Sequence, residues 1–463
     1  MELGDVQEFF AGKTILVTGV TGFLGKVFVE KMLRVQPDIK KLYLLIRSPN
    51  IGLATQRLHV EVFRKELFKV QRAEKGADFD SFISEKVVAV VGDVSLEMLG
   101  VKDVKRNEEM LKEIDIIVHS AATTKLDDRF DTAMATNTMG ALNVLDYAKN
   151  CRKLEILLYV STAYVCGEPK GLVIEKPFFM GQTLKGGSLK LDIKLEKKLI
   201  EEKISELKAE NANEETINSV MKNFGMIRAN LHGWPNTYVF TKAMGEMLVA
   251  NMKDNLPLII IRPTIVISTH SEPFPGWIEE VRTMDYVVDK YGKGTIRSFV
   301  GVPETVVDVI PADMVVNSMI IASVARSKNL CRSLIYHIGS SSRNPFKYSD
   351  LIDDMHCYFT KNPWINKNDR PVHVEKKLTL FSTRMDEFDK NKGTKMETAI
   401  ELYRPYGLFE GIFDDQNVEK LRMVAKRVVD TTFNFDPKNI VWKDYMMNVH
   451  FPGIVKHSMR SKM

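Results

Sequence analysis

Short, nearly continuous apolar runs recur between the N-terminus and about residue 270, and more polar segments separate them. The runs are Thr14–Val17, Leu42–Ile46, Val87–Val91, Ile114–Val118, Ile156–Val160 and Leu258–Ile261. A strand that is buried on both faces of a parallel sheet has this pattern, because helices cover both of its sides. The runs therefore predict the buried strands of a parallel sheet.

Segments with helical spacing alternate with these runs. Residues 137–148 place most of their apolar side chains on one side, and another such segment follows the first run directly. The apolar positions of that segment are Phe23, Val27, Val29, Met32 and Leu33. Alternating strands and helices are typical of an α/β fold. We therefore predict a doubly wound, parallel Rossmann-type sheet with helices on both faces.

The interval between the run at Ile156–Val160 and residue 236 is too long for a plain connection from a strand to a helix. It contains a charged segment, Leu195–Leu207, whose apolar residues share one face of a helix. We predict a large insertion at about residues 168–235 that lies over the sheet. Two interpretations of its helix are open: a solvated amphipathic helix, or a lid on a substrate pocket.

The alternation fades after residue 345, where the chain becomes mixed in pattern and prolines interrupt it repeatedly. We predict a reductase-like α/β domain at residues 1–345 and a smaller, mostly helical C-terminal domain at residues 346–463. The stretch Glu375–Glu397 is polar and charged, which makes it the candidate for a linker.

Composition narrows the class of protein. Hydrophobic residues make up 44% of the 463 residues and charged residues 27%, which is ordinary for a globular protein with a sizeable core. The net charge of +5 favours anionic ligands mildly, but no dense stripe of Arg and Lys indicates nucleic acid. The four cysteines lack metal-ligand spacing and indicate reduced thiols, so no metal site is expected: Cys151, Cys166, Cys331 and Cys357.

The N-terminal residues contain acidic side chains and no apolar core of a signal peptide. No apolar run reaches the length of about 18 residues that suggests a transmembrane helix. We therefore expect an intracellular protein that is not secreted.

A glycine-rich turn, TGVTGFLG, follows the first predicted strand and precedes the first predicted helix. Gly19, Gly22 and Gly25 let the backbone turn sharply and approach a pyrophosphate at the positive end of the helix. In this context the motif predicts a dinucleotide site. We expect the neighbouring residues of the turn to contact the cofactor as well: Thr21, Phe23 and Leu24.

The second predicted strand indicates which cofactor binds. A site for NAD usually has an acidic residue at the end of this strand, but here the position holds Arg47. A cation favours a 2′-phosphate, so the sequence predicts NADPH. We expect Asp93 to lie near the adenine, and Ala121, within His119–Thr124, to lie near the cofactor.

Two Tyr-x-x-x-Lys spacings occur, at Tyr238 and Lys242 and at Tyr286 and Lys290. The first pair lies between the strand that ends before Thr162 and the strand at Leu258–Ile261, so it reaches the edge where chemistry gathers in such sheets. An ammonium near a Tyr hydroxyl lowers its pKa and makes it an acid or base, and a Thr hydroxyl can hold the same substrate oxygen. We predict that the catalytic residues are Tyr238, Lys242 and Thr162, that Lys242 also contacts the cofactor, and that the second pair is a coincidence.

Longer strings extend these motifs into a family resemblance. The glycine turn, the Ser-Thr at a strand end and the Tyr-x-x-x-Lys resemble the extended short-chain dehydrogenase/reductases. The chain resembles the plant alcohol-forming fatty acyl-CoA reductases over nearly its whole length, and its second domain resembles their C-terminal male sterility domain. The strings that carry this likeness include AATTKLDDRFD, VSTAYVCGE, HGWPNTYVFTKAMGEM, EPFPGWIEE, GIFDDQNVEKLR and FNFDPKNIVWKDY.

The resemblance implies reduction of long- or very-long-chain fatty acyl-CoA to a primary alcohol, with two NADPH and an aldehyde between the two hydride transfers. Tyr238 and Lys242 match the active-site pair of the family, Gly19, Gly22 and Gly25 its cofactor turn, and Thr162 the hydroxyl residue of the extended reductases. No covalent enzyme intermediate is implied, so Cys166 is expected to be a packing residue. The resemblance also implies lipid, wax or suberin synthesis at the cytosolic face of the endoplasmic reticulum, with the cytosol as the alternative and peripheral membrane association possible.

One interval departs from the family pattern. The interval at residues 374–401 is short and charged, whereas the resemblance implies an additional apolar stretch at this place. Two alternatives therefore stay open: another extended reductase acting on a sugar nucleotide or a sterol, and a non-catalytic or impaired paralogue. The sequence leaves the chain length of the substrate and the oligomeric state undetermined.

Overall fold

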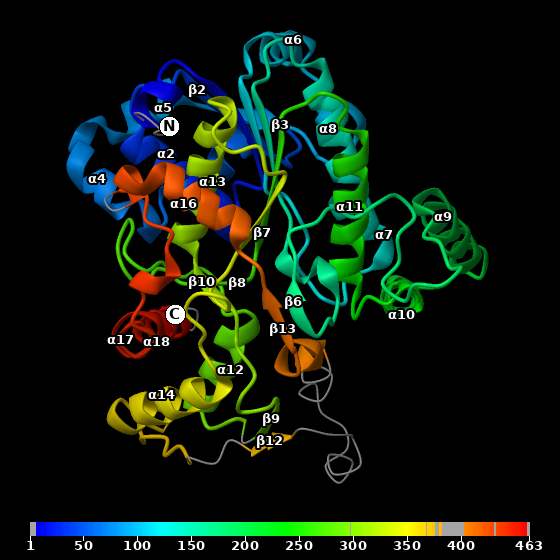
Figure 1. Ribbon diagram of the computed structural model, residues 1–463. Helices are drawn as coiled ribbons and strands as arrows, with labels where there is room; N and C mark the ends of the chain where they lie inside the picture. The colour runs from blue at the N-terminus through cyan, green and yellow to red at the C-terminus, as the bar shows by residue number, and fades with distance from the viewer. Residues whose placement is uncertain are drawn as a thin grey trace.

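The computed structural model describes residues 6–296, 298–366, 368–375, 379–381, 402–429 and 432–460. Its centre is a sheet of seven parallel strands between two layers of helices (Figure 1). The strand order is β11-β7-β5-β4-β1-β2-β3. The strands are β1 (Thr14–Thr18), β2 (Lys41–Ile46), β3 (Val87–Val91), β4 (Ile116–His119), β5 (Ile156–Val160), β7 (Leu258–Pro263) and β11 (Ile335–Ile338). The predicted doubly wound Rossmann-type sheet and its six strands are confirmed.

The strands alternate their side chains between two buried layers, which explains their continuous apolar runs. On β1, Ile15 and Val17 join one core cluster while Leu16 joins another on the opposite face. Helices α2 (Phe23–Val35) and α13 (Ala312–Ser327) cover the first face, and α8 (Gly140–Asn150) and α11 (Thr237–Met252) cover the second (Figure 1). Both faces are thus removed from water, so neither needs polar residues.

The predicted helix over residues 137–148 begins earlier in the structure. A π-helical turn at Met134–Met139 runs directly into α8. Asn137 lies in this turn, where its side chain is bonded to the backbone of Thr123 and to the hydroxyl of Thr241. The turn thereby ties the loop after β4 to the helix α11.

The insertion contains two helices, α9 (Ile193–Ala209) and α10 (Glu214–His232). They pack on α7 (Phe130–Ala133) and α11 rather than over the sheet, which corrects the predicted position (Figure 1). The reason is that α8 and α11 already cover that face of the sheet. The apolar sides of α9 and α10 instead join a core cluster with residues of α11: Ile200, Leu207, Ile217, Met221, Phe240 and Met244.

The C-terminal region is interleaved with the rest of the chain. Strand β13 (Gly411–Phe413) pairs in parallel with β6 (Gly171–Val173), and β12 (Thr379–Phe381) pairs with β9 (Ser298–Val300). Helix α16 (Gln416–Val429) packs on α13 and β11. The division at residue 345 stays a prediction, and most of the interval 374–401, including most of the predicted linker, lies outside the described residues.

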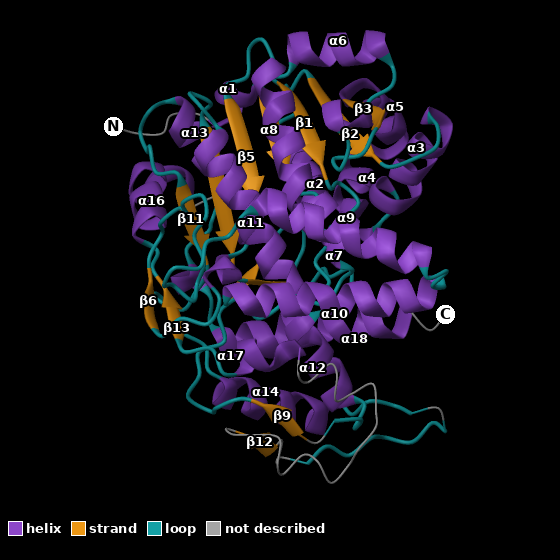
Figure 2. Ribbon diagram, turned by 90° about the vertical axis from the view of Figure 1, so that its right-hand side faces the viewer, coloured by secondary structure: helices purple, strands orange, loops and turns teal. Residues whose placement is uncertain are grey.

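The remaining helices and strands surround this frame. In Figure 2 the strands of the sheet point toward a layer that includes α10, α12, α17 and α18. The other elements are α1 (Val6–Phe10), α3 (Ile51–Leu58), α4 (Lys69–Lys75), α5 (Phe79–Lys86), α6 (Val104–Glu113), β8 (Ile265–Ile267), α12 (Thr283–Gly292), β10 (Val309–Pro311), α14 (Tyr348–Lys361), α17 (Trp442–Tyr445) and α18 (Phe451–Arg460). Every helix in the part of the chain that the structure describes is too short or too polar to cross a bilayer.

Candidate active site

The glycine turn lies at the carboxyl end of β1, which pairs with β2 on one side and β4 on the other. The strand order reverses at this point, where open α/β sheets bind their ligands. Gly19 has a φ of 76°, and a Cβ atom there would lie 2.5 Å from the backbone nitrogen of Ala121. A Cβ atom on Gly25 would lie 2.3 Å from the carbonyl oxygen of Gly19. The backbone is therefore packed too closely for side chains at these two positions.

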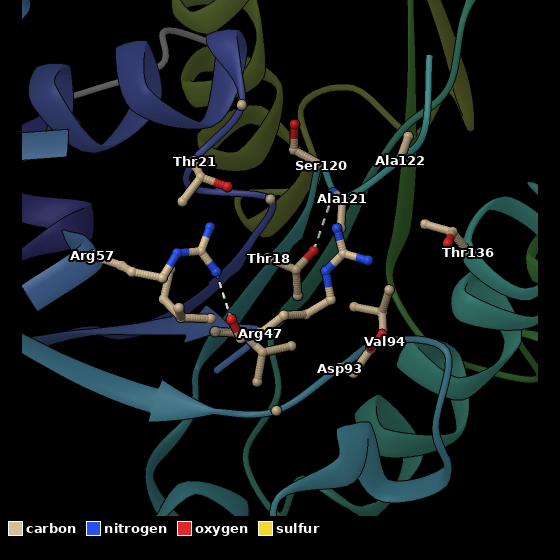
Figure 3. Close-up of a pocket in the computed structure, with 15 residues that line it drawn as sticks. Thr18, Thr21, Arg47, Arg57, Asp93, Val94, Ser120, Ala121, Ala122 and Thr136 are labelled. Carbon is tan, nitrogen blue, oxygen red and sulfur yellow. Dashed lines mark hydrogen bonds between the residues drawn. The ribbon is translucent and has the colours of Figure 1, made fainter. Parts of the chain in front are cut away.

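A groove opens between this turn and the ends of β2, β3 and β4 (Figure 3). Its lining residues are Thr18, Gly19, Thr21, Gly22, Leu45, Ile46, Arg47, Arg57, Gly92, Asp93, Val94, Ser120, Ala121, Ala122 and Thr136. Six residues predicted to bind the cofactor are among them: Gly19, Thr21, Gly22, Arg47, Asp93 and Ala121. The other four predicted residues do not line it. Phe23 packs its ring 5.1 Å from that of Trp277, Leu24 packs on the core, Gly25 abuts Gly19, and Lys242 lies at the catalytic cluster.

Arg57 was missed by the sequence analysis. It lies on α3, and Asn50 caps this helix by accepting a hydrogen bond from the backbone of Leu53 at 2.9 Å. Arg57 donates from Nη1 to the carbonyl oxygen of Arg47 at 2.5 Å and from Nε to Glu61 at 2.8 Å. The Asn50 cap was the available signal, because it turns α3 back over the end of β2.

The two arginines differ in how their charge is used. Glu61 holds the guanidinium of Arg57, whereas the exposed guanidinium of Arg47 has no ion-pair partner within the described residues. Asp93 is also engaged, since its Oδ1 accepts from the backbone and hydroxyl of Ser95 at 2.9 and 2.8 Å. Among the described residues, Arg47 at the end of β2 is therefore the lining cation without an ion-pair partner, and it lies next to the turn that would hold a pyrophosphate.

The predicted Tyr and Thr meet at the carboxyl ends of the strands. Asn236 caps α11 by accepting from the backbone of Val239 at 3.1 Å, so Tyr238 lies in the first turn of this helix. Thr162 follows β5; its hydroxyl donates to the carbonyl oxygen of Pro263 at 3.5 Å and lies close enough to the hydroxyl of Tyr238 to oppose the rise in the pKa of that residue. The backbone of Tyr164 donates to Thr162 Oγ1 at 3.3 Å and fixes that side chain. The structure thus brings together two groups that are far apart in sequence.

Lys242 contacts the last residues of β5. Its Nζ donates to the carbonyl oxygen of Val160 at 2.7 Å and lies 4.3 Å from the ring centroid of Tyr159. Burial lowers the pKa of Lys242 to about 7, against the opposing effect of Glu246. Burial raises the pKa of Tyr238 to about 12, although Thr162 and Arg282 oppose the shift. The pKa of Tyr238 thus moves in the direction opposite to the predicted lowering, because the effect of burial exceeds those of Thr162 and of the charge of Arg282.

A buried polar network lies behind this cluster and was also missed. Glu246 accepts from the hydroxyl of Ser161 at 2.8 Å and from Arg262 Nε at 3.1 Å. Arg262 Nη1 lies 3.1 Å from His337 Nε2, and His337 Nδ1 lies 3.1 Å from the carbonyl oxygen of Asp414. Burial, with the nearby guanidinium, lowers the pKa of His337 to about 3, so this imidazole stays neutral. The network connects the end of β5 to the C-terminal region.

His119, in the predicted cofactor segment, is a structural group. Its Nδ1 lies 2.7 Å from the hydroxyl of Thr18, and its ring stacks on Tyr159 at 5.5 Å. Burial lowers the pKa of His119 to about 3, and the charge of Lys242 adds to the effect. A neutral imidazole thus joins the ends of β1 and β4.

The second Tyr-x-x-x-Lys lies on α12. The ammonium of Lys290 is 5.3 Å from the ring centroid of Tyr286, and that ring stacks on Tyr403 at 6.5 Å. The pair is thus held by ring contacts rather than by a strand-end hydroxyl. Among the described residues, no cluster of three or more His, Cys, Asp or Glu side chains could hold a metal ion.

The groove and the Tyr–Thr pair lie at one edge of the same parallel sheet, and this arrangement defines a Rossmann-type reductase that uses a nicotinamide cofactor. Solved structures show the same fold. The terminal R domain of the myxalamid pathway matches with a TM-score of 0.61 and 17% identity over 97% of this chain and 91% of that domain. A reductase domain of a non-ribosomal peptide synthetase from Mycobacterium tuberculosis gives 0.59 and 16%, over 100% and 99%.

Sequence comparisons then specify the family. Two family models, both described as male sterility protein, match residues 17–319 and 378–461. The alcohol-forming fatty acyl-CoA reductase of Simmondsia chinensis is 50% identical over 98% of this chain and 99% of its own length. Fatty acyl-CoA reductase 8 of Arabidopsis thaliana is 47% identical over 99% and 100%, and fatty acyl-CoA reductase 2 of Homo sapiens is 32% identical over 100% and 87%. The chain belongs to the fatty acyl-CoA reductase family, as the sequence motifs indicated.

Proposed function

We propose that the protein reduces a long- or very-long-chain fatty acyl-CoA to a primary fatty alcohol and releases CoA. Two hydride transfers in succession would do this, with an aldehyde between them. Relatives at 47–50% identity carry the names of fatty acyl-CoA reductases, and one is named alcohol-forming. The structural observation that carries the proposal is the Tyr238–Thr162 hydroxyl pair at the cofactor edge of the sheet. This pair alone would also fit a reductase that acts on a sugar nucleotide or a sterol. Membership of the fatty acyl-CoA reductase family disfavours those two alternatives.

The hydroxyl pair accounts for both rounds of chemistry. The bound nicotinamide cofactor supplies the hydride in each round. In the first, Tyr238 and Thr162 donate hydrogen bonds to the thioester oxygen, which gains charge as its carbon is attacked. The resulting hemithioacetal collapses and releases CoA. In the second, Tyr238 gives its proton to the aldehyde oxygen, and a phenol with a pKa of about 12 carries that proton at neutral pH.

Two further side chains fit this scheme. Lys242 lies one turn after Tyr238, where it would hold the cofactor beside the reacting carbon. Burial raises the pKa of Cys166 to about 12, so its thiol stays protonated and is a poor nucleophile. This supports a mechanism without an acyl-enzyme, with Cys166 as a packing residue.

NADPH is the cofactor that we propose. The free guanidinium of Arg47 supports this choice; Arg57 is paired with Glu61 but lines the same groove, and its positive charge would also attract the phosphate. Steady-state kinetics with both cofactors would test it. We expect a markedly higher kcat/KM with NADPH, and equal or better turnover with NADH would contradict the proposal.

The reaction itself is tested by incubation with NADPH and acyl-CoAs of varied length, followed by product analysis. We expect primary alcohol from the wild type and a loss of about 10²- to 10⁴-fold in Tyr238→Phe, because a general acid contributes that much. Wild-type rates in Tyr238→Phe would refute the role of this residue. Absence of fatty alcohol, with turnover of a sugar nucleotide or a sterol instead, would favour the other extended reductases.

An impaired paralogue is the second candidate. The alignment with the Simmondsia chinensis relative covers 489 positions, whereas this chain has 463 residues, so the relative has positions that this chain lacks. Complete inactivity that returns when an apolar segment is inserted near residue 380 would favour this reading. Activity without any insertion would exclude it.

The cytosolic face of the endoplasmic reticulum is the location that we propose, with peripheral attachment and the cytosol as the alternative. An apolar substrate and product support it, since long acyl chains partition into bilayers. Fractionation would test it: we expect sedimentation with microsomes and release by alkaline carbonate. Protein that is entirely in the soluble fraction would favour the cytosol.

A further inference from the structure

A short helical segment of the C-terminal region, residues 402–407, lies beside the start of α11, which carries Tyr238, and the segment after β5, which carries Thr162. It precedes β13, which pairs with β6 below the main sheet (Figure 1). Tyr406 is its last aromatic residue, and it contacts one neighbour of Tyr238 and one neighbour of Thr162.

The first contact is to the cap of the catalytic helix. Asn236 Nδ2 donates to the hydroxyl of Tyr406 at 3.2 Å, while Asn236 Oδ1 accepts from the backbone of Val239 at 3.1 Å. Asn236 is almost fully buried, with 1% of its surface exposed. One side-chain amide therefore both caps α11 and binds Tyr406, so the phenol fixes which way the amide faces. Tyr238 lies two residues further on.

The second contact is to the segment of Thr162. The ring of Tyr406 meets the ring of Tyr164 edge-on, with centroids 4.9 Å apart. The backbone of Tyr164 donates to Thr162 Oγ1 at 3.3 Å. Phe409 and Phe413 pack on the same ring at 5.3 and 5.4 Å, which closes the cluster against water.

The chemistry of Tyr406 suits a fixed, neutral contact. Burial raises its pKa above the ordinary value, against the effect of Asn236, so the hydroxyl keeps its proton at physiological pH. The neutral hydroxyl can therefore accept the hydrogen bond from Asn236 at physiological pH. No other partner of Asn236 Nδ2 occurs among the described residues.

We propose that Tyr406 is a positioning residue of the reductase: it holds the Tyr238 and Thr162 segments at the spacing that catalysis requires. The C-terminal region then completes the active site instead of lying beside it. This inference rests on the proposed roles of Tyr238 and Thr162, and it explains why the segment 402–413 reaches back to the carboxyl ends of the sheet.

The test uses the full-length enzyme and three variants: Tyr406→Phe, Asn236→Ser and the double variant. Tyr406→Phe keeps the ring and loses the hydroxyl. Asn236→Ser keeps an oxygen that can cap α11 and loses the donor to Tyr406. Each single variant should lower kcat about three- to tenfold, the loss expected for one net hydrogen bond, with KM for acyl-CoA and for the cofactor unchanged.

The double variant distinguishes positioning from general destabilisation. If the contact is the cause, the double variant should lose no more than either single variant. The control is Tyr291→Phe, which loses a hydrogen bond of 2.8 Å from its hydroxyl to the carbonyl oxygen of Glu375 and touches neither catalytic segment. It should keep the wild-type kcat even where its melting temperature falls.

Three outcomes would overturn the inference: a wild-type kcat in Tyr406→Phe, additive losses in the double variant, or an equal loss in Tyr291→Phe. Tyr238→Phe is measured in parallel. If Tyr238→Phe is inactive and Tyr406→Phe is normal, only the inference fails. If Tyr238→Phe is itself fully active, the proposed function fails first.

Discussion

At the scale of single residues, the active site contains an ionisable side chain, Lys242, in a buried position that disfavours its charged form. Lys242 is 2% exposed; its ammonium contacts a backbone carbonyl and an aromatic ring, and the nearby charge of Glu246 offsets only part of the cost of burial. Such a site favours the neutral amine, which is why the pKa falls to about 7. Burial of the Lys242 ammonium therefore lowers the stability of the folded protein, and the residue occupies this position one turn after Tyr238.

Replacement of Lys242 should expose this cost as a pH-dependent stability. The unfolded lysine has a pKa near ~10.4, so between about pH 7 and that value the unfolded state binds more protons and the wild type gains stability as pH rises. Below pH 7 the full penalty of the buried charge is present. Lys242→Met should therefore melt above the wild type at pH 6, and this advantage should shrink from pH 7 to 10.

Melting temperatures measured by calorimetry across this range would check the trend. Lys198→Met, on the exposed side of α9 at 70% side-chain exposure, is the matched control and should show no such trend. A constant difference between Lys242→Met and wild type would show that Lys242 titrates normally.

Arg57 offers a second test at this scale. If both arginines bind the 2′-phosphate, Arg57→Ala should raise KM for NADPH about 10- to 100-fold, the range for a lost hydrogen bond to a charged group. KM for NADH should stay unchanged, because NADH lacks that phosphate. Parallel kinetics on Arg47→Ala give the reference, and an equal effect of Arg57→Ala on both cofactors would contradict a role in phosphate binding.

At the scale of elements, close packing decides where the insertion sits. Helix α10 approaches the start of α11 through Gly225, where a Cβ atom would lie 2.6 Å from Thr237 Oγ1 and 3.0 Å from Phe130 Cβ. Glu196 ties α9 to α10 through Arg228 at 2.9 Å and His232 at 3.1 Å. The insertion is thus fixed to the catalytic helix by packing and by a buried carboxylate, so a lid that opens by moving α10 would have to break these contacts.

Gly225→Ala tests that contact against the helix propensity of alanine. Alanine should favour α10 by up to about 1 kcal/mol, but the clash should cost about 1–3 kcal/mol. We expect a net loss in the free energy of unfolding and a lower kcat, measured by denaturant titration and by activity. Gly52→Ala, in α3, is the control because its Cβ would meet nothing closer than 3.5 Å. Stabilisation in both variants would show that α10 can shift freely.

Elements differ in how well the sequence predicted them. The six central strands were found because both of their faces are buried. The strand β11 was missed because it is only four residues long and places His337 among its apolar residues. Helix α10 was missed because Ile227 and Leu231 are exposed at 55% and 41% and blur the apolar face that Ile217 and Met221 form.

At the scale of the whole molecule, the regions before and after residue 345 share one core. A single cluster of buried side chains runs from Val6 to Ile454 and includes residues of α2, α13, α14 and α18. Glu175 joins the regions further, since its carboxylate accepts from the backbones of His337 at 2.8 Å and Asn417 at 2.7 Å. A core of this kind favours one cooperative unit.

We therefore expect the full-length protein to unfold in a single calorimetric transition, with a van't Hoff enthalpy close to the calorimetric one. Addition of NADPH should raise that one melting temperature, since a ligand that binds only the folded state stabilises all of a cooperative unit. Two transitions, with only one moved by the cofactor, would show that the C-terminal region folds as a separate domain.

The sequence by itself determined the parallel sheet, the glycine turn and the Tyr238–Thr162 pair. It could do so because burial on both faces, tight turns and strand-end hydroxyls leave local signals. The tertiary structure alone decided the direction in which the pKa of Tyr238 shifts and the position of Arg57 beside Arg47. It also decided where the insertion packs and that Tyr406 contacts Asn236. Each of these depends on how deeply a group is buried and on which distant segment packs against it. The local pattern of apolar and polar residues does not determine either of them.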